Sequence, residues 1–509
     1  MTLGERLLCN LTGLGLFTAV GWSLLGFFPA LLKRRLLAAL SFAYLLGLST
    51  LCSASWAVNH VLGIPLRRPL FLFLGAILLL AGWVARRMTS RSTAPESAPA
   101  WSLPAKVMGG AAATLASIVI GGMLLGTISL VTRDFDGQMT WTVAARYVRA
   151  AGAVDPPVLR ERRWFVTHPR YPLLIPLSQV VTQEVFGAPN DDDRAVRWIY
   201  AFFYPVYLGV LFDGVRRRCG NLVGALVALV FVFIPLPAFG ESGGASGTMS
   251  DFPLACFLGA AVLLLTERRL TASGSLAGGV FLASALLTKN EGGPLALAAI
   301  VAALLPRGVR AIRARAQGRS VGTLPWKAVA CLVLPVLCAA ALSISWRTGI
   351  VNRYDEGYEQ MRGVSRIVKA TIARAPLLPG PMWEEMRRPQ DWGGFWLIIP
   401  FSLLFGLPGL LRGRARGLLL MVAGGVAVYV VAYGNTPWGE AELVHPTWSR
   451  FLLQLSMPGL TLLAFALRHC LLNVRRVVVP ALTSWSRRRA PPGPASPSPA
   501  ASRPRCPGP

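Results

Sequence analysis

The sequence predicts an all-α protein that crosses a membrane many times. Of its 509 residues, 54% are hydrophobic and only 15% are charged, and the mean hydropathy is +0.52. Apolar runs of about 20 residues, long enough to span the hydrocarbon core as helices, recur along almost the whole chain. Breaks rich in arginine, glycine or proline separate these runs. A soluble multidomain protein is therefore excluded, and we expect a bundle of about 13 transmembrane helices.

Positive charge is spread along the chain in short clusters. The formal net charge of +28 could suggest nucleic acid, but the arginines stand at the ends of apolar runs rather than on one basic face. They indicate topology, because cytoplasmic loops carry an excess of Lys and Arg and anionic lipids attract them. The expected partner is thus the lipid bilayer and not nucleic acid. The eight cysteines lie mostly inside apolar runs, so they predict neither a disulfide framework nor a zinc site.

Residues 1–106 are expected to hold three transmembrane helices and a cytoplasmic loop. The helices are predicted over 7–32, 36–63 and 69–85, and a flexible loop rich in Ser, Pro and Ala over 88–105. The first run ends in Lys33-Arg34-Arg35 without a small-residue cleavage site, so it indicates a retained helix rather than a signal peptide.

Placing the arginine-rich loops in the cytoplasm gives a consistent order of spans from residue 107 to residue 470. The N-terminus is then external, the C-terminus is cytoplasmic, and Arg67-Arg68 would face outside. Residues 471–509 are expected to form a basic cytoplasmic tail, disordered from about residue 486 because of its Pro, Ser and Ala content. The expected spans are 107–131, 194–214, 221–237, 251–266, 275–288, 293–305, 327–347, 394–411, 418–434 and 450–470.

The same order makes residues 132–193 one external loop. Residues 138–151 place Trp, Val and Tyr opposite Gln, Thr and Arg at helical spacing, which predicts an interfacial helix. The apolar segment 171–186 is expected to be a second interfacial helix, because a crossing there would move Arg216-Arg217-Arg218 outside. Further external stretches are expected at 241–251, 288–292, 347–392 and 434–450, where most of the acidic residues fall.

The chemistry of the chain is expected in these external stretches. Asp134 and Asp136 directly follow an apolar run, where carboxylates are costly unless they are solvated or used. They could act as general bases or bind a divalent cation such as Mg²⁺ or Mn²⁺, whereas Lys and Arg could hold a phosphate. Lys289-Asn290-Glu291 separates two short apolar runs, which indicates either a cavity or a tight external turn. The other candidates are His168 to Pro172, His445 and Arg450.

Four motifs follow one another along the chain, namely Asp136 with Trp141 and Arg146, the segment from His168 to Leu177, the segment from Thr288 to Gly292, and the segment from His445 to Leu455. In this order they resemble bacterial membrane glycosyltransferases of the GT-C fold. The similarity is to the family 39-like members, which are dolichyl-phosphate-mannose-protein mannosyltransferase-like or aminoarabinose transferase-like. It covers about 107–470, which would form the transmembrane catalytic region of a GT-C-like bundle.

The resemblance implies a polyprenyl-phosphate-linked sugar as donor and inverting transfer to an acceptor hydroxyl. It assigns Asp136 as general base and Asp134 as its assistant or as a metal ligand, although members with monophosphate donors commonly need no metal. By position, Arg170 and Lys289 would contact the donor phosphate, and His168 and Arg450 would add hydrogen bonds or charge. Other residues expected at the site are Trp141, Arg146, Tyr171, Glu291 and His445.

The expected location is the inner (plasma) membrane of a cell envelope, with the active site on the external, periplasmic side. The chain lacks the Pro-Pro-Leu version of the interfacial motif and offers no large soluble domain at its end. The acceptor could therefore be a glycan, a lipid or a protein.

Two other functions stay open. A flippase or transporter of lipid-linked glycan would also have many spans, although it should show an internal repeat. An O-antigen ligase or polymerase-like enzyme would use the arginine-rich loop 347–392.

Overall fold

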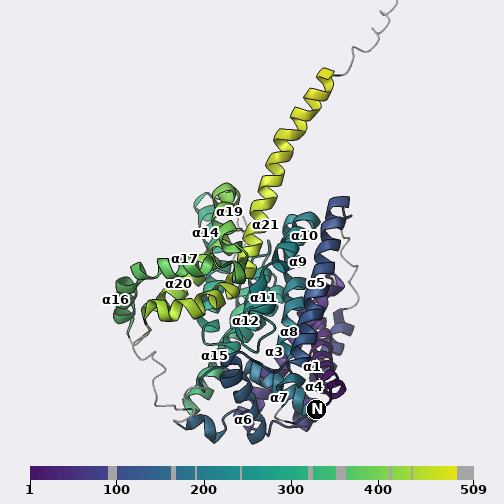
Figure 1. Cartoon of the computed structure of the whole chain (residues 1–509), viewed down its shortest axis with the longest axis vertical. Coiled ribbons are helices and arrows are strands. Elements are labelled where there is room, and N and C mark those ends of the chain that lie inside the picture. Colours follow the sequence, from purple (N-terminus) through teal and green to yellow (C-terminus); the bar gives the residue numbers. More distant parts are fainter. Residues whose placement is uncertain are drawn as a thin grey trace, which may run out of the picture.

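The structure, a computed structural model, describes residues 1–89, 100–161, 168–189, 192–240, 243–318, 325–350, 363–411, 415–436 and 439–489. These residues form helices joined by turns, and none of them forms a strand (Figure 1). Nine helical segments of this part of the chain are long and apolar enough to cross a membrane. The chain is thus an all-α, multi-pass membrane protein, as its composition predicts.

The long apolar segments alternate with shorter helices along the chain. The long ones are Leu3–Phe27 (α1, Leu3–Leu24, and the 3-10 turn η1, Leu25–Phe27), α3 (Leu36–Leu62), α4 (Arg68–Thr89), α5 (Leu103–Ser129), Trp198–Cys219 (α8, Trp198–Ala201, and α9, Phe203–Cys219), α14 (Gly292–Ala316), α15 (Trp326–Gly349), α20 (Ala415–Gly434) and Leu443–Asn473 within α21 (Glu440–Arg489). Most of the shorter elements are α2 (Pro29–Leu32), η3 (Gly137–Thr142), α6 (Val143–Ala151), η4 (Pro157–Arg160), α7 (Leu174–Phe186), η6 (Asp193–Ala195), α11 (Pro235–Phe239), α16 (Val364–Arg374), η8 (Ala375–Leu377), α17 (Pro379–Met386) and α18 (Pro389–Trp392).

Four of the expected spans are short helices. They are α10 (Asn221–Val232), α12 (Asp251–Leu265), α13 (Ala272–Thr288) and α19 (Phe395–Leu410), with 12, 15, 17 and 16 residues. At about 1.5 Å per residue, each is shorter than the roughly 30 Å hydrocarbon core. Every residue of α12 is buried, so this helix is surrounded by protein rather than by lipid.

The N-terminal helices pack through glycine. A Cβ atom on Gly21 would lie 1.7 Å from the carbonyl oxygen of Ala43, and one on Gly47 would lie 1.7 Å from that of Phe17. The backbones of α1 and α3 can approach this closely only because both residues lack a side chain. The predicted span 7–32 is interrupted, since α1 ends at Leu24 and α2 starts at Pro29.

The loop 132–193 contains both predicted helices, but α7 is not an exposed one. Its residues from Leu174 to Gln183 are buried, and it packs against α1, α3 and α6. A helix that lies on a bilayer leaves one face open to lipid, so α7 differs from the interfacial helix expected over 171–186. The physical reason is that apolar or uncharged polar side chains occupy almost its whole circumference, with Glu184 as its one charged residue.

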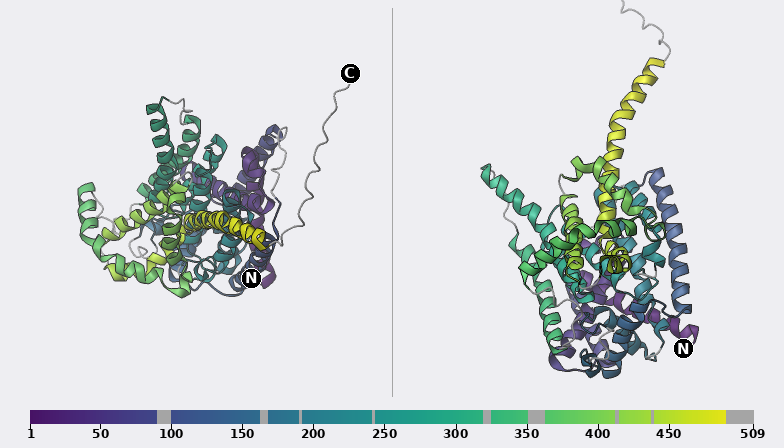
Figure 2. Two further views of the ribbon diagram at one scale, coloured as in Figure 1. Left: turned by 90° about the horizontal axis from the view of Figure 1, so that it is seen from above. Right: turned by 60° about the vertical axis from the view of Figure 1, so that its left-hand side comes forward.

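Different helices lie at the two ends of the molecule. The helices α6 and α7 lie at the end where the N-terminus lies, whereas the last part of α21 extends from the opposite end (Figure 1; Figure 2). Because α21 is continuous to Arg489, the tail predicted from residue 471 begins as helix. The dense Pro, Ser and Ala sequence starts only at residue 490. Residues 490–509, like 90–99 of the predicted loop 88–105, lie outside the described residues.

Candidate functional site

Five charged side chains from distant parts of the chain meet in one ionic network. Asp136 follows α5, Asp251 opens α12, Lys289 and Glu291 occupy the break between α13 and α14, and Arg450 lies on α21. Three of the four motif segments contribute to this network, and the fourth contributes Arg170 to the adjacent cavity.

Asp251 lies at the centre of the ionic network with its side chain fully buried. Its Oδ1 accepts hydrogen bonds from Lys289 Nζ at 2.7 Å and from Gln454 Nε2 at 2.8 Å. Its Oδ2 accepts from Arg450 Nη2 at 3.0 Å and from Arg450 Nε at 3.1 Å. Both oxygens are thus satisfied by charged or amide donors, without which a buried carboxylate would be strongly destabilising.

Arg450 joins Asp251 to Asp136. Its Nη1 donates to Asp136 Oδ2 at 2.7 Å. Gln454 follows it by four residues on α21, so the two side chains lie on the same face of the helix and reach Asp251 together. The hydroxyl of Tyr429 donates to Gln454 Oε1, which ties α20 to the same network.

The break between α13 and α14 holds Lys289 inside the protein. Lys289 is extended (φ −155°, ψ 156°) and ends α13. A Cβ on Gly292 would lie 1.9 Å from the carbonyl oxygen of Ala285, so this glycine lets the chain turn back tightly. Lys289 is only 2% exposed, and its Nζ lies 3.3 Å from Glu291 Oε1. The segment is therefore both a tight turn and one wall of a cavity.

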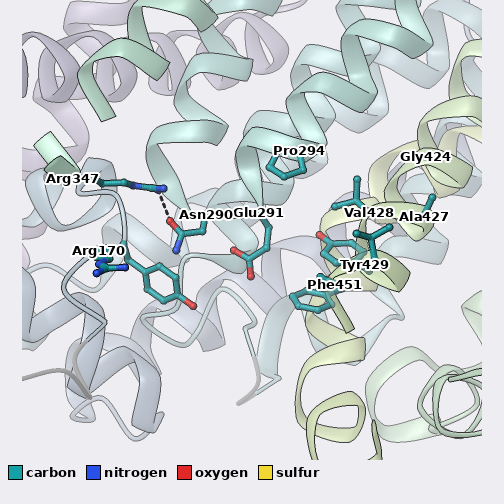
Figure 3. A pocket seen from close by; sticks show the side chains of 13 residues that line it. Arg170, Asn290, Glu291, Pro294, Arg347, Gly424, Ala427, Val428, Tyr429 and Phe451 are labelled. Atoms are coloured by element: carbon teal, nitrogen blue, oxygen red, sulfur yellow. Dashed lines mark hydrogen bonds between the residues drawn. The ribbon is translucent and has the colours of Figure 1, made fainter. Parts of the chain in front are cut away.

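A cavity of about 620 Å³ is lined by Glu291 of the ionic network (Figure 3). Arg170 and Arg347 lie at one side of it, where Arg347 donates to Asn290 Oδ1. Glu291 lies between this cationic side and an apolar wall. An amphiphile with an anionic group fits such a combination. The wall is formed by Pro294, Gly424, Ala427, Val428, Tyr429, Val431, Ala432 and Phe451.

Asp134 is separated from this network by its own contacts. Its carboxylate accepts from the Thr248 backbone N–H at 3.3 Å and from the Thr248 hydroxyl at 3.2 Å. A Cβ on Gly137 would lie 1.7 Å from Asp134 Oδ2, so the packing there is tight. Burial raises the pKa of Asp134 above its usual value, against the opposing effect of the bonds from Thr248. Asp134 therefore anchors the loop after α5 to the segment before α12.

The divalent cation considered for Asp134 and Asp136 does not fit this arrangement. The two carboxylates are engaged by different partners, Thr248 and Arg450. A cation at Asp136 would compete with the guanidinium of Arg450 for the same carboxylate. In the described part of the chain, no group of three or more His, Cys, Asp and Glu side chains could hold a metal ion.

Trp141, His168 and Tyr171 form an aromatic stack at the edge of the cavity. The ring centroids of Trp141 and Tyr171 are 5.2 Å apart, and the angle between the two ring planes is 4°. The ring centroids of His168 and Tyr171 are 5.0 Å apart. Trp141 is buried, whereas Tyr171 lines the cavity. Trp141 and His168 thus position Tyr171 but do not themselves line the cavity.

His445 and Arg146 lie outside the cavity lining as well. His445 Nδ1 lies 2.7 Å from Oε1 of the buried Glu385 on α17, which makes it a link between α17 and α21. His445 and Arg450 are five residues apart, so their side chains point about 140° apart around the axis of α21. They therefore lie on different faces of the helix. Arg146 is half-buried in α6.

The structure adds Asp251, Tyr429 and Gln454, which the sequence does not single out. Asp251 lies 199 residues from Arg450 and 38 residues from Lys289, so no local pattern joins them. One signal was present. Asp251 is the one acidic residue between 242 and 266 and stands at the edge of an apolar run, the same feature that marks Asp134 and Asp136.

Comparisons with known proteins give no match, since no family model, no curated protein and no solved structure matches the chain.

Proposed function

We propose that the protein is an integral-membrane glycosyltransferase that moves a sugar from a polyprenyl-phosphate donor to an acceptor hydroxyl. The observation that carries this proposal is the position of the cavity beside the ionic network. Arg170 and Arg347 make one side of the cavity cationic, α20 makes another side apolar, and Glu291 belongs to both cavity and network. A donor of this class joins an anionic phosphodiester to a long apolar chain, so its two halves match the two sides.

In the proposed reaction, Asp136 accepts the proton of the acceptor hydroxyl. The acceptor oxygen attacks the anomeric carbon from the face opposite the phosphate. The new carbon–oxygen bond forms while the sugar–phosphate bond breaks, its electron pair leaves on polyprenyl phosphate, and the anomeric configuration inverts. Asp136 is 35% exposed, so an acceptor can reach it, and Arg450 fixes its orientation. Glu291, 20% exposed, is the second carboxylate that could serve as base.

The basic residues divide into two roles in this proposal. Arg170 and Arg347 line the cavity and would hold the donor phosphate, stabilising the charge that grows on it as the bond breaks. Lys289 and Arg450 are engaged with Asp251 and act as positioning residues for the carboxylates. The phosphate contact expected of Lys289 is thereby reassigned to Arg347.

The proposal includes a GT-C-like bundle with its site on the external, periplasmic side of the inner membrane. Its support is that residues of all four motif segments gather at the network and the cavity although they are far apart in the chain. The opposite positions of α6 with α7 and of the end of α21 agree with the sidedness that the arginine clusters predict (Figure 1).

Transfer of radiolabelled sugar from polyprenyl-phosphate donors in vesicles tests the proposal. Asp136→Asn should lower the rate about 100-fold or more, as expected for loss of a general base. Asp155→Asn is the matched control, because Asp155 lies in the same loop in an exposed pair with Arg160, and its rate should equal that of the wild type. A rate lost in Glu291→Gln but kept in Asp136→Asn would assign the base to Glu291.

Two other results of the same assay would reject the transferase. If the wild type transfers no sugar from any monophosphate donor but moves the labelled lipid across the vesicle bilayer, the protein is a flippase. If transfer occurs only from a diphosphate-linked glycan, the ligase or polymerase class is favoured.

A further inference from the structure

We propose that a second cavity, at the far end of α12 and α14, binds a phosphate group. This cavity has a volume of about 240 Å³ and is lined by Glu267, Arg268, Arg307, Arg310 and Gly417, among others. Arg307 follows Glu291 by 16 residues on one helix, which separates the two sites by about 24 Å along α14. The phosphate site is thus distinct from the proposed transferase site. We call it the arginine cavity.

The orientation of two arginines in the arginine cavity is fixed by backbone carbonyls. Arg307 Nη2 donates to the carbonyl oxygen of Glu267 at 2.7 Å, and its Nη1 donates to that of Ala303. Arg310 Nε donates to the carbonyl oxygen of Pro306 at 3.0 Å. Carbonyl oxygens hold a guanidinium in place without cancelling its formal charge, and each guanidinium keeps further N–H donors for a ligand.

The charge of the arginine cavity is not balanced by carboxylates. Across the described residues, no carboxylate forms an ion pair with Arg268, Arg307 or Arg310. The carboxylate of Glu267 is already engaged, because its Oε1 lies 2.6 Å from Arg34 Nη2 and 4.0 Å from Arg217 Nε.

A general preference of arginine for the cytoplasmic side does not account for this arrangement. That preference requires only that a residue be exposed at the end of a span, as Arg269 and Arg313 are. Arg268 and Arg310 are exposed as well, but together with the half-buried Arg307 they also line one cavity. Guanidinium groups are the preferred partners of phosphate oxygens, with which they form paired, charge-assisted hydrogen bonds. The ligand class is therefore a phosphate, carried by an anionic lipid headgroup or by a soluble phosphate compound.

Two probes of the full-length protein in phosphatidylcholine nanodiscs test this inference. The first is a photoactivatable phosphatidylglycerol whose attachment is mapped to peptides, and the second is radiolabelled inorganic phosphate. The test variant is Arg268→Gln with Arg310→Gln, which leaves Arg307 and its backbone bonds intact. The matched control is Arg269→Gln with Arg313→Gln, which removes two exposed charges from the same segments without touching the cavity lining.

We expect binding to fall about tenfold or more in the test variant and to stay unchanged in the control, since each lost charged hydrogen bond is worth about a factor of ten. Lipid attachment to peptides around Glu267 or Arg310 would identify a headgroup, and phosphate binding without lipid attachment would identify a soluble ligand. Equal losses in both variants, or binding of neither probe by the wild type, would overturn the inference. Neither readout depends on sugar transfer.

Discussion

At the scale of single residues, Arg450 has the largest structural role in the ionic network. One guanidinium pairs with Asp136 and with the fully buried Asp251. Removing one partner of a buried ion pair costs about 3–5 kcal/mol, because the other charge is left without compensation. The network therefore couples the stability of the fold to the geometry of the proposed site.

Arg450→Lys should destabilise the protein and abolish transfer although it keeps the charge. A lysine ammonium is a single point charge and cannot span two carboxylates as the guanidinium fork does. We expect a lower thermal unfolding midpoint in detergent. The control is Arg160→Lys, at an exposed pair with Asp155, where exposed pairs contribute about 0–1 kcal/mol. Equal midpoints for Arg450→Lys and the wild type would show that the network does not stabilise the fold.

Asp134 should make stability depend on pH in a defined direction. Burial raises the pKa of Asp134 in the folded protein, so the folded state binds more protons than the unfolded state between the ordinary value near 3.9 and the raised one. This contribution to stability is fully present below that ordinary value and is lost as pH rises through the folded pKa.

Asp134→Asn removes this titration while keeping an oxygen that can accept from Thr248. The unfolding midpoint of the variant, relative to that of the wild type at the same pH, should therefore rise as the pH increases from about 4 through the raised pKa of Asp134. A difference that stays constant or falls over this range would contradict the account of Asp134 as a buried anchor.

At the scale of helices, close backbone contact decides how the N-terminal bundle packs. We predict that Gly47→Ala is strongly destabilising, because the added Cβ would lie 1.7 Å from the carbonyl oxygen of Phe17 and would push α1 away from α3. Gly15→Ala on α1 is the control, since nothing lies within 4 Å of a Cβ there. Unfolding midpoints in detergent compare the two, and similar midpoints would mean that the helices separate without cost.

His445 tests whether a motif residue acts in chemistry or in packing. His445→Ala removes the contact with Glu385 between α17 and α21, while Arg388 remains 2.7 Å from the same carboxylate oxygen. We expect a stability loss of about 1 kcal/mol and a transfer rate close to that of the wild type. A rate lowered as much as in Asp136→Asn, at unchanged stability, would return His445 to the reacting groups.

The sequence predicts where helices begin and end better than it predicts whether lipid or protein covers them. Apolar runs between arginine clusters predict α3 and α4 within a few residues. The burial of α7 could not be predicted, because the sequence of an apolar helix is the same whether lipid or protein covers it. Only the packing of α1, α3 and α6 against α7 settles the question.

At the scale of the whole molecule, the site joins segments that no local pattern connects. Asp136 and Arg450 are 314 residues apart. Each is a charge at the end of an apolar run, and the resemblance to membrane glycosyltransferases assigns each a role without predicting their ion pair. Lys289 and Glu291 are marked in the sequence by the break between two apolar runs. Asp251 is the partner that Lys289 and Arg450 share. Its position depends on how α12 and α21 pack, which hydropathy does not encode.

The central claim is that the cavity binds the donor while Asp136 of the ionic network acts as the base, and measuring these two roles separately tests it most directly. The measurement is steady-state sugar transfer from a polyprenyl-phosphate donor by purified wild type, by Asp136→Asn and by Arg170→Gln with Arg347→Gln. We predict that Asp136→Asn lowers kcat about 100-fold or more with KM for the donor nearly unchanged. The double arginine variant should raise KM for the donor, because it removes two cations from the cavity lining. Unchanged kcat in Asp136→Asn together with unchanged KM in the double variant would contradict the assignment of this site to sugar transfer.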